Sequence, residues 1–251
     1  MFEFDNKSTL IIIFVIIAVA LFATNQIDIY STVISLPGLI IALSLHEFAH
    51  AWMAVKLGDP TPKMQGRLNV NPLSHMDPIG TICLLFAHFG WGKPVQINPT
   101  NFNKPEKDSA KVALAGPVMN FILAIISAIL YAVLIVCAIN FGGAYIYGDT
   151  IQYTTVWNTL LDIVYYAMLL NLGLCIFNLL PFPPLDGSKI FRAILKGKAK
   201  EFLYTLEKYS MIIIMILFAT NAASYIISPI VEAIYNYVLV PIMSAILGIA
   251  L

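Results

Sequence analysis

The sequence predicts an all-α, polytopic membrane protein that forms a single membrane-embedded domain over residues 1–251. Hydrophobic residue types make up 59% of the chain and charged types only 11%, and the mean hydropathy is +0.83. A typical soluble domain carries about 25% charged residues. The fourteen basic and fourteen acidic side chains cancel, which excludes a nucleic-acid-binding protein that relies on bulk positive charge.

Long apolar runs predict about six membrane-spanning helices. They lie at about residues 8–24, 33–57, 110–140, 155–180, 209–223 and 227–251. A helix needs about 20 apolar residues to cross the hydrocarbon core, and the last two runs are the least clearly bounded. The first run follows Glu3 and Asp5 instead of a positive segment, which favours an uncleaved helix over a signal peptide.

The basic residues predict the orientation of these spans. All but Lys7 of the fourteen Lys and Arg residues lie in two connectors, residues 56–111 and 189–208. The short connectors 25–32 and 141–154 contain none. By the positive-inside rule, the two basic connectors face the cytosol, and both termini join them there if the spans number six.

One apolar segment, Ile79–Gly90, is too short to cross the bilayer. It follows a stretch rich in Pro and Asn, residues 58–78, whose composition favours turns over long helices. We therefore expect a short membrane-associated hairpin or re-entrant segment between the second and third spans.

The second predicted span contains His46-Glu47-Phe48-Ala49-His50, an H-E-x-x-H pattern. On a helix, residues four apart lie on one face, so both imidazoles can bind a single zinc ion. Glu47 then lies beside the metal, where it can take a proton from a water molecule whose pKa the zinc lowers. The pattern predicts a zinc-dependent hydrolase.

Three ionisable residues within five positions of a span are costly unless they have a partner. Each costs about 2.5–3.5 kcal/mol at the centre of a spanning helix. A zinc ion is one such partner. The alternative is a buried polar cluster or an ion or proton pathway, as in a transporter, although the sequence shows no paired halves with matching broken spans, which mark many transporters.

A catalytic zinc usually has three protein ligands and an open position, and Asp186 is the best candidate for the third. It lies in the segment NLLPFPPLDG, residues 178–187, in which prolines stop the helix and Gly187 allows a tight turn or a close approach. His46 and His50 lie about 10–16 Å from the cytosolic end of their span, and Asp186 comes from the same end of its own span. An ordinary Asp-Gly turn is the alternative.

Other polar residues receive less specific interpretations. His75 is an alternative third ligand or a polar contact near the metal, but a local structural role in its loop is preferred. His88 and Asp162 are interpreted as interfacial or helix-contact residues. The three cysteines are widely spaced and contain no CxxC pair, so they are interpreted as packing residues rather than ligands.

Several segments together resemble the site-2 protease family of intramembrane zinc metalloproteases. HEFAH (46–50) and NLLPFPPLDG (178–187) resemble the paired signatures of that family. GRLNVNPLSHMDPIGTI, GWGKPVQIN and ALAGPVMN resemble the intervening segments of its compact prokaryotic branch. The similarity covers about residues 40–190 in the family's order, and the sequence shows neither the PDZ nor the CBS domains that many relatives carry.

The resemblance implies roles for individual residues. His46, His50 and Asp186 match the ligands of one zinc ion per chain, and Glu47 matches the catalytic base. Asn178 matches an asparagine that helps to hold the reacting carbonyl or its oxyanion.

Two further features match less specific parts of the family pattern. Asn120 matches a polar position on the third span and is expected to have an auxiliary role. Residues 69–78 match a membrane-associated hairpin used in handling substrate, and Arg67–Asn71 is a candidate edge that receives an extended substrate by strand addition.

The expected activity is hydrolysis of peptide bonds in or near transmembrane segments of membrane proteins, as in regulated intramembrane proteolysis. The expected partners are single-span membrane-protein substrates and the lipid bilayer, without nucleic acid, and a regulatory membrane protein is left open. The expected location is a prokaryotic plasma membrane, with the active site nearer the cytosolic side. The alternatives are an ion- or proton-coupled transporter and a non-catalytic scaffold, although a purely structural metal site has no need of a base such as Glu47.

Overall fold

The structure is a computed structural model and describes residues 28–78, 80, 92–147 and 150–250. Four helical stretches in this part of the chain are long and apolar enough to cross a membrane: α2 (Ile29–Lys56), α6 (Pro105–Asn140), α7 (Thr155–Leu179) and the run Ala222–Gly248. The last run comprises α11 (Ala222–Ile234), the π-helical turn η2 (Tyr235–Leu239) and most of α12 (Val240–Ala250). The chain is therefore an integral membrane protein with a mainly helical fold.

These helices coincide with four of the six predicted spans. The predicted first span, residues 8–24, lies outside the described residues. The expected re-entrant segment, residues 79–90, also lies outside them except for Gly80. The predicted fifth span contains α10 (Ser210–Ala219), whose ten residues rise only about 15 Å. Because α10 is too short to cross the bilayer alone, the count of six spans is not confirmed.

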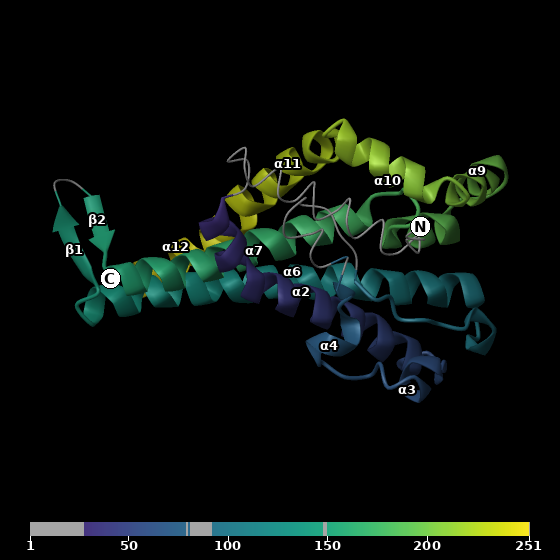
Figure 1. The fold of residues 1–251 in the computed structure, drawn as a ribbon, viewed down its shortest axis with the longest axis horizontal. Coiled ribbons are helices and arrows are strands. Elements are labelled where there is room, and N and C mark those ends of the chain that lie inside the picture. Colours follow the sequence, from purple (N-terminus) through teal and green to yellow (C-terminus); the bar gives the residue numbers. More distant parts are fainter. Residues whose placement is uncertain (1–27, 79, 81–91, 148–149, 251) are drawn as a thin grey trace, which may run out of the picture.

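The helices α2, α6 and α7 pack together along the centre of the molecule (Figure 1). An apolar cluster joins α6 and α7 to the C-terminal helices and consists of Ala124, Ala128, Ala132, Met168, Leu172, Leu239 and Met243. The three alanines recur every four residues on α6, and such small residues let helices approach closely within lipid. Gly38 serves α2 in the same way, because a Cβ there would lie 2.6 Å from the Cα of Ala167 on α7.

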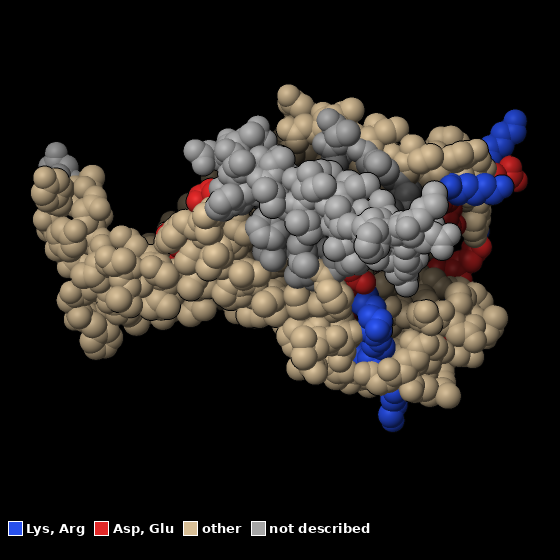
Figure 2. Space-filling view, viewed as in Figure 1, with Lys and Arg blue, Asp and Glu red and all other residues tan. Residues whose placement is uncertain are grey.

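The two ends of the molecule differ in structure and charge. One end carries a two-stranded antiparallel hairpin, β1 (Ala144–Tyr147) and β2 (Thr150–Tyr153), in which Ala144 pairs with Tyr153. The opposite end carries short elements (Figure 1): α3 (Thr61–Met64), α4 (Pro72–His75), η1 (Pro99–Asn101), α8 (Asp186–Ile194) and α9 (Lys198–Glu207). On the face shown in Figure 2, Lys and Arg lie toward this second end. Both basic connectors therefore lie at one end, as their charge pattern predicts.

Two predictions about polar segments can be compared with the structure. The hydroxyl of Tyr30 on α2 donates to Asp162 Oδ2 on α7 at 2.6 Å, which confirms Asp162 as a helix-contact residue, whereas His88 lies outside the described residues. The candidate edge at Arg67–Asn71 is not a strand in the structure and has bends at Leu68 and Asn69. Strand addition by a substrate at this stretch stays a prediction. The side chain of Asn69 accepts the amide proton of Asn71 at 2.8 Å, and such local bonds compete with strand pairing.

Candidate metal centre

Three potential ligands meet where α2 passes the start of α8. His46 and His50 lie one turn apart on the same face of α2, and both are buried. Asp186, the first residue of α8, is also buried. The Nε2 atoms of the two histidines are 3.0 Å apart, and Oδ2 of Asp186 lies 3.2 Å from Nε2 of His46 and 3.0 Å from Nε2 of His50. The structure thus unites the three predicted ligands.

The contacts of His50 determine which of its nitrogens carries hydrogen. Its Nδ1 lies 2.7 Å from the main-chain carbonyl oxygen of Val112 on α6. Because a carbonyl oxygen only accepts hydrogen bonds, Nδ1 must donate. In the neutral ring, Nε2 then presents a lone pair toward His46 and Asp186, as a metal ligand requires.

A pair of asparagines, one on α6 and one on α7, determines in the same way which ring nitrogen of His46 carries hydrogen. The Nδ2 group of Asn120 donates to the carbonyl oxygen of Ala42 at 3.3 Å and to Oδ1 of Asn171 at 2.9 Å. This leaves Oδ1 of Asn120 to accept from Nδ1 of His46. The Nε2 atom of His46 therefore also presents a lone pair. Asn120, predicted only as an auxiliary residue, lies in direct contact with a candidate ligand.

The resulting arrangement fits a metal ion. With both rings neutral, three acceptor atoms converge at 3.0–3.2 Å with no hydrogen between them, so a cation is needed to join them. Zinc binds imidazole nitrogen at about 2.0–2.1 Å in tetrahedral sites, which places neighbouring ligand atoms about 3.3 Å apart. The observed spacing and the His-His-Asp donor set both suit zinc.

Gly116 on α6 leaves space beside the ligand atoms. A Cβ at this position would lie 2.5 Å from Nε2 of His50 and 2.6 Å from Nε2 of His46, far inside the distance that real Cβ atoms keep. Any side chain here would occupy the space in front of the two nitrogens. The glycine thus fits the presence of an ion at the position where the lone pairs point.

The turn before α8 brings Asp186 to this position. A Cβ on Gly187 would lie 2.2 Å from the carbonyl oxygen of Leu180 and 2.4 Å from that of Leu179, so the predicted close approach is confirmed. As the first residue of α8, Asp186 also benefits from the positive end of the helix dipole. Its second oxygen, Oδ1, lies 3.6 Å from Nζ of Lys189.

The predicted base, Glu47, contacts the main chain of the segment that leads to α6. Its Oε2 atom accepts the amide proton of Val95 at 2.9 Å. This segment is held on both sides of that contact, since the amide of Lys93 donates to the carbonyl oxygen of His75 at 2.8 Å and the amide of Asn98 donates to Asp59. A fixed amide donor therefore restrains the carboxylate of Glu47.

The side chains of two predicted site residues, Asn178 and His75, each donate to a carbonyl oxygen nearby in the sequence. The Nδ2 group of Asn178 donates to the carbonyl oxygen of Leu174, one turn earlier on α7, at 3.1 Å. His75, the alternative third ligand, does not belong to the metal-ligand group found among the described residues. Its Nε2 donates to the carbonyl oxygen of Asn69 at 2.7 Å, a contact within its own loop, as the preferred interpretation expects.

Sequence reasoning missed three contributors to the site: the space at Gly116, the side-chain amide group of Asn171 and the main-chain amide of Val95. Gly116 and Asn120 are four residues apart, so their spacing places them on the same helix face. That spacing was a usable signal for Gly116. A main-chain donor such as the Val95 amide leaves no signal in residue type.

Two histidines and a carboxylate from separate helical elements, next to a glutamate and within a helical membrane protein, form a candidate metal centre of the hydrolase type. The chain belongs to peptidase family M50, whose profile matches residues 34–221. This membership confirms the resemblance to the site-2 proteases.

Curated relatives are named as zinc metalloproteases. YwhC of Bacillus subtilis, named as a candidate zinc metalloprotease, is 38% identical over 195 residues, which cover 78% of this chain and 84% of YwhC. Rip2 of Mycolicibacterium smegmatis, named in the same way, is 26% identical over 76% of this chain and 68% of its own length. Zinc metalloprotease MJ0392 of Methanocaldococcus jannaschii is 26% identical over 74% of this chain but only 41% of its own length. No solved structure gives a significant match.

Proposed function

We propose that the chain is a zinc-dependent endopeptidase that hydrolyses peptide bonds in or near transmembrane segments of membrane-protein substrates. The observation that carries this proposal is the convergence of three acceptor atoms from His46, His50 and Asp186, on and beside a helix long enough to span the bilayer. Membership of a peptidase family and the names of the relatives support it.

In this proposal, His46, His50 and Asp186 hold one Zn²⁺. The ion supplies a Lewis acid that activates water and polarises the scissile carbonyl. Glu47 accepts the proton of the attacking water and later returns it to the leaving nitrogen. The Val95 amide holds Oε2 of Glu47 in one orientation during both transfers.

Asn178 keeps its proposed role as a donor to the developing oxyanion. One of its two amide hydrogens bonds to Leu174, and the amide group has a second hydrogen to donate. Donors directed at a developing oxyanion are among the strongest contributions to such reactions.

The charge distribution sets the proposed orientation in the membrane. The site lies at the end of α7 from which the basic connector 189–208 starts, so we place it nearer the cytosol in a prokaryotic plasma membrane. Water reaches Glu47 from that side. A substrate helix keeps its carbonyls in its own hydrogen-bond ladder, so it must unwind locally, and helix-breaking residues favour this step.

The test is a comparison of metal content and cleavage in purified protein. In detergent, the wild type is expected to bind zinc and to cleave a single-span reporter substrate. Glu47→Gln should keep its zinc but lose cleavage by at least about 100-fold, because the base is removed. Glu201→Gln, the same change at an exposed position on α9, is the matched control and should behave as wild type.

Each other result contradicts the proposal. Cleavage by Glu47→Gln at the wild-type rate would show that Glu47 is not the base. A wild-type protein that binds zinc but cleaves nothing would favour the scaffold. A metal-free protein that transports ions in vesicles would favour the transporter.

A further inference from the structure

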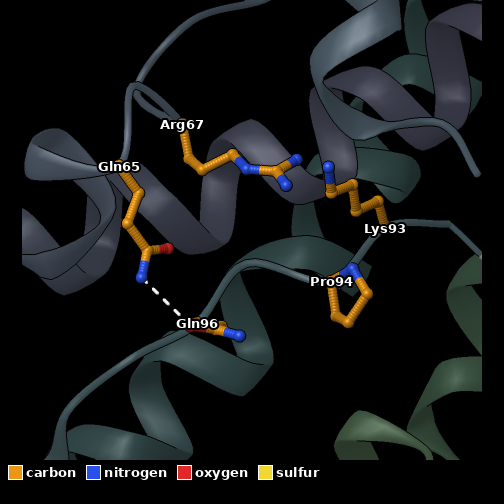
Figure 3. A pocket seen from close by; sticks show the side chains of 5 residues that line it. All are labelled: Gln65, Arg67, Lys93, Pro94 and Gln96. Atoms are coloured by element: carbon orange, nitrogen blue, oxygen red, sulfur yellow. Dashed lines mark hydrogen bonds between the residues drawn. The ribbon is translucent and has the colours of Figure 1, made fainter.

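A polar cavity lies next to the segment that contacts Glu47. It has a volume of about 410 Å³ and lies between the turn that follows α3 and the segment that leads to η1 (Figure 3). Its lining residues are Gln65, Arg67, Lys93, Pro94 and Gln96. The Nε2 group of Gln65 donates to Oε1 of Gln96 at 3.0 Å, which ties the two walls together.

Two positive charges face each other in this cavity. Figure 3 shows the guanidinium group of Arg67 and the ammonium group of Lys93 pointing toward one another from opposite walls. Among the residues that the structure describes, neither forms an ion pair with a carboxylate. By contrast, Lys111, Lys189, Arg192 and Lys200 each do. Like charges that face one another repel, whereas an anion placed between them attracts both side chains.

The donors in the cavity suit a carboxylate. The planar guanidinium group offers paired N–H donors that match the two oxygens of a carboxylate or phosphate. One Nη atom of Arg67 donates to the carbonyl oxygen of Ser74, which orients the group. The side-chain amides of Gln65 and Gln96 add further polar contacts at the wall.

The position of the cavity ties it to the proposed active site. Pro94 and Gln96 line the cavity, and Val95 between them donates its amide to Glu47. An extended chain advances about 3.3 Å per residue, so a substrate bound at Glu47 has side chains within reach of the cavity a few residues from the cleaved bond. Among the described residues, Pro94 is the one lining residue without a polar side chain.

We propose that this cavity binds the side-chain carboxylate of an Asp or Glu residue of the substrate, a few residues from the cleaved bond. The inference rests on the proposed function and adds a substrate class: membrane-protein segments that carry an acidic residue next to the cleavage site.

The test uses the full-length protein in phosphatidylcholine vesicles and a single-span reporter substrate. A single Glu is moved through successive positions on each side of the cleavage site, and each substrate is compared with its Gln counterpart. The wild type should cleave the Glu substrate with about tenfold higher kcat/KM at one or two adjacent positions, as a charge-assisted contact predicts. Lys93→Gln and Arg67→Gln should lose this preference, and Lys93→Glu should prefer Lys to Glu there.

The controls separate this inference from its competitors. Lys63→Gln, an exposed residue of α3 that does not line the cavity, should keep the wild-type preference. Because Arg67 also holds Ser74, Lys93→Gln decides the result if Arg67→Gln fails to fold. Equal cleavage of Glu and Gln substrates by the wild type at every position would overturn the inference, as would an unchanged preference in Lys93→Gln.

Two further outcomes have distinct meanings. If both variants change activity only when anionic phosphatidylglycerol replaces part of the neutral lipid, the cavity binds a lipid phosphate and the inference is wrong. If Glu47→Gln cleaves as fast as wild type while the Glu preference persists, the proposed catalytic function fails and the carboxylate site stands.

Discussion

Asp59 and Asp186 are both buried acidic residues, but they differ in the groups that surround them. Asp59, just after α2, accepts four hydrogen bonds from protein donors: the amide and hydroxyl of Thr61, the side chain of Asn101 and the amide of Asn98. Asp186 instead directs Oδ2 at the Nε2 atoms of His46 and His50, whose hydrogens lie on Nδ1.

This difference separates a structural carboxylate from a cation site. A buried carboxylate that receives a full set of donors stabilises the folded chain, because its charge is compensated by the protein itself. Lys189 lies beside Oδ1 of Asp186, but Oδ2 faces the lone pairs of two imidazoles, and a cation between these three atoms would join them. Asp59 and Asp186 are both buried carboxyl groups, so the type of atom that each one faces distinguishes the structural carboxylate from the cation site.

The largest expected effect comes from filling the space in front of the imidazole nitrogens. Gly116→Ala should lose its zinc and lower cleavage by at least about 100-fold, since even loss of an outer contact to a ligand costs about 10–100-fold. Elemental analysis and the reporter assay measure both. Gly173→Ala on α7, where a Cβ meets nothing within 4 Å, is the control. A zinc-replete Gly116→Ala protein would show that the ion lies elsewhere.

A smaller effect is expected from the group that orients His46. Asn120→Ala should weaken zinc binding by about 10–100-fold, because the ring is no longer held with its lone pair toward the site. Competition with a zinc chelator measures this. Asn140→Ala removes an exposed asparagine that bonds only within the same helix and should leave the affinity unchanged. Equal affinities in the two variants would refute the assigned role of Asn120.

The main-chain contact of Glu47 should have a smaller effect again. Val95→Pro removes the amide proton and should lower kcat by about tenfold with zinc content unchanged, because the carboxylate loses a charge-assisted hydrogen bond. Val95→Ala keeps the amide and serves as the matched control. If the proline variant cleaves faster than the alanine variant, the segment obstructs the site instead of orienting the base.

The smallest effect concerns Asp59 and affects stability alone. Burial raises the pKa of this carboxyl, but the hydrogen bonds from Thr61, Asn101 and Asn98 outweigh burial and hold the pKa below its usual 3.8. A carboxyl whose pKa is lower in the folded state stabilises the fold above its usual pKa and loses that contribution as the pH falls through the folded value. Stability should therefore decrease as the pH falls below about 4.

The matching variant is Asp59→Asn, which should lower the free energy of unfolding by about 1–3 kcal/mol at pH 7 while it retains zinc. Melting curves in detergent between pH 7 and pH 3 measure the difference from wild type, which should shrink at the acid end. A difference that stays constant with pH would mean that the charge of Asp59 contributes nothing.

The sequence predicted those features that depend on local patterns. The i, i+4 spacing placed His46 and His50 on one helix face, and the prolines after Asn178 marked the end of α7 at Leu179. The close approach at Gly187 followed from residue type. Asp186 was a candidate from its position at the end of a span, and the family resemblance selected it.

Features that depend on tertiary contacts were not predictable in this way. The main-chain amide of Val95 carries no residue signal, and two of the four donors to Asp59 come from a segment about forty residues later in the chain. The candidate edge at Arg67–Asn71 is not a strand, and the side chain of Asn69 forms local hydrogen bonds there instead. Such local bonds compete with strand pairing.

The most direct test of the central claim is the zinc content of Asp186→Ala beside that of Asp59→Asn and the wild type. We predict one zinc ion per chain in the wild type and in Asp59→Asn, and less than about a tenth of that in Asp186→Ala, since a catalytic zinc site depends on its third protein ligand. A full complement of zinc in Asp186→Ala, or none in the folded wild type, would contradict the account.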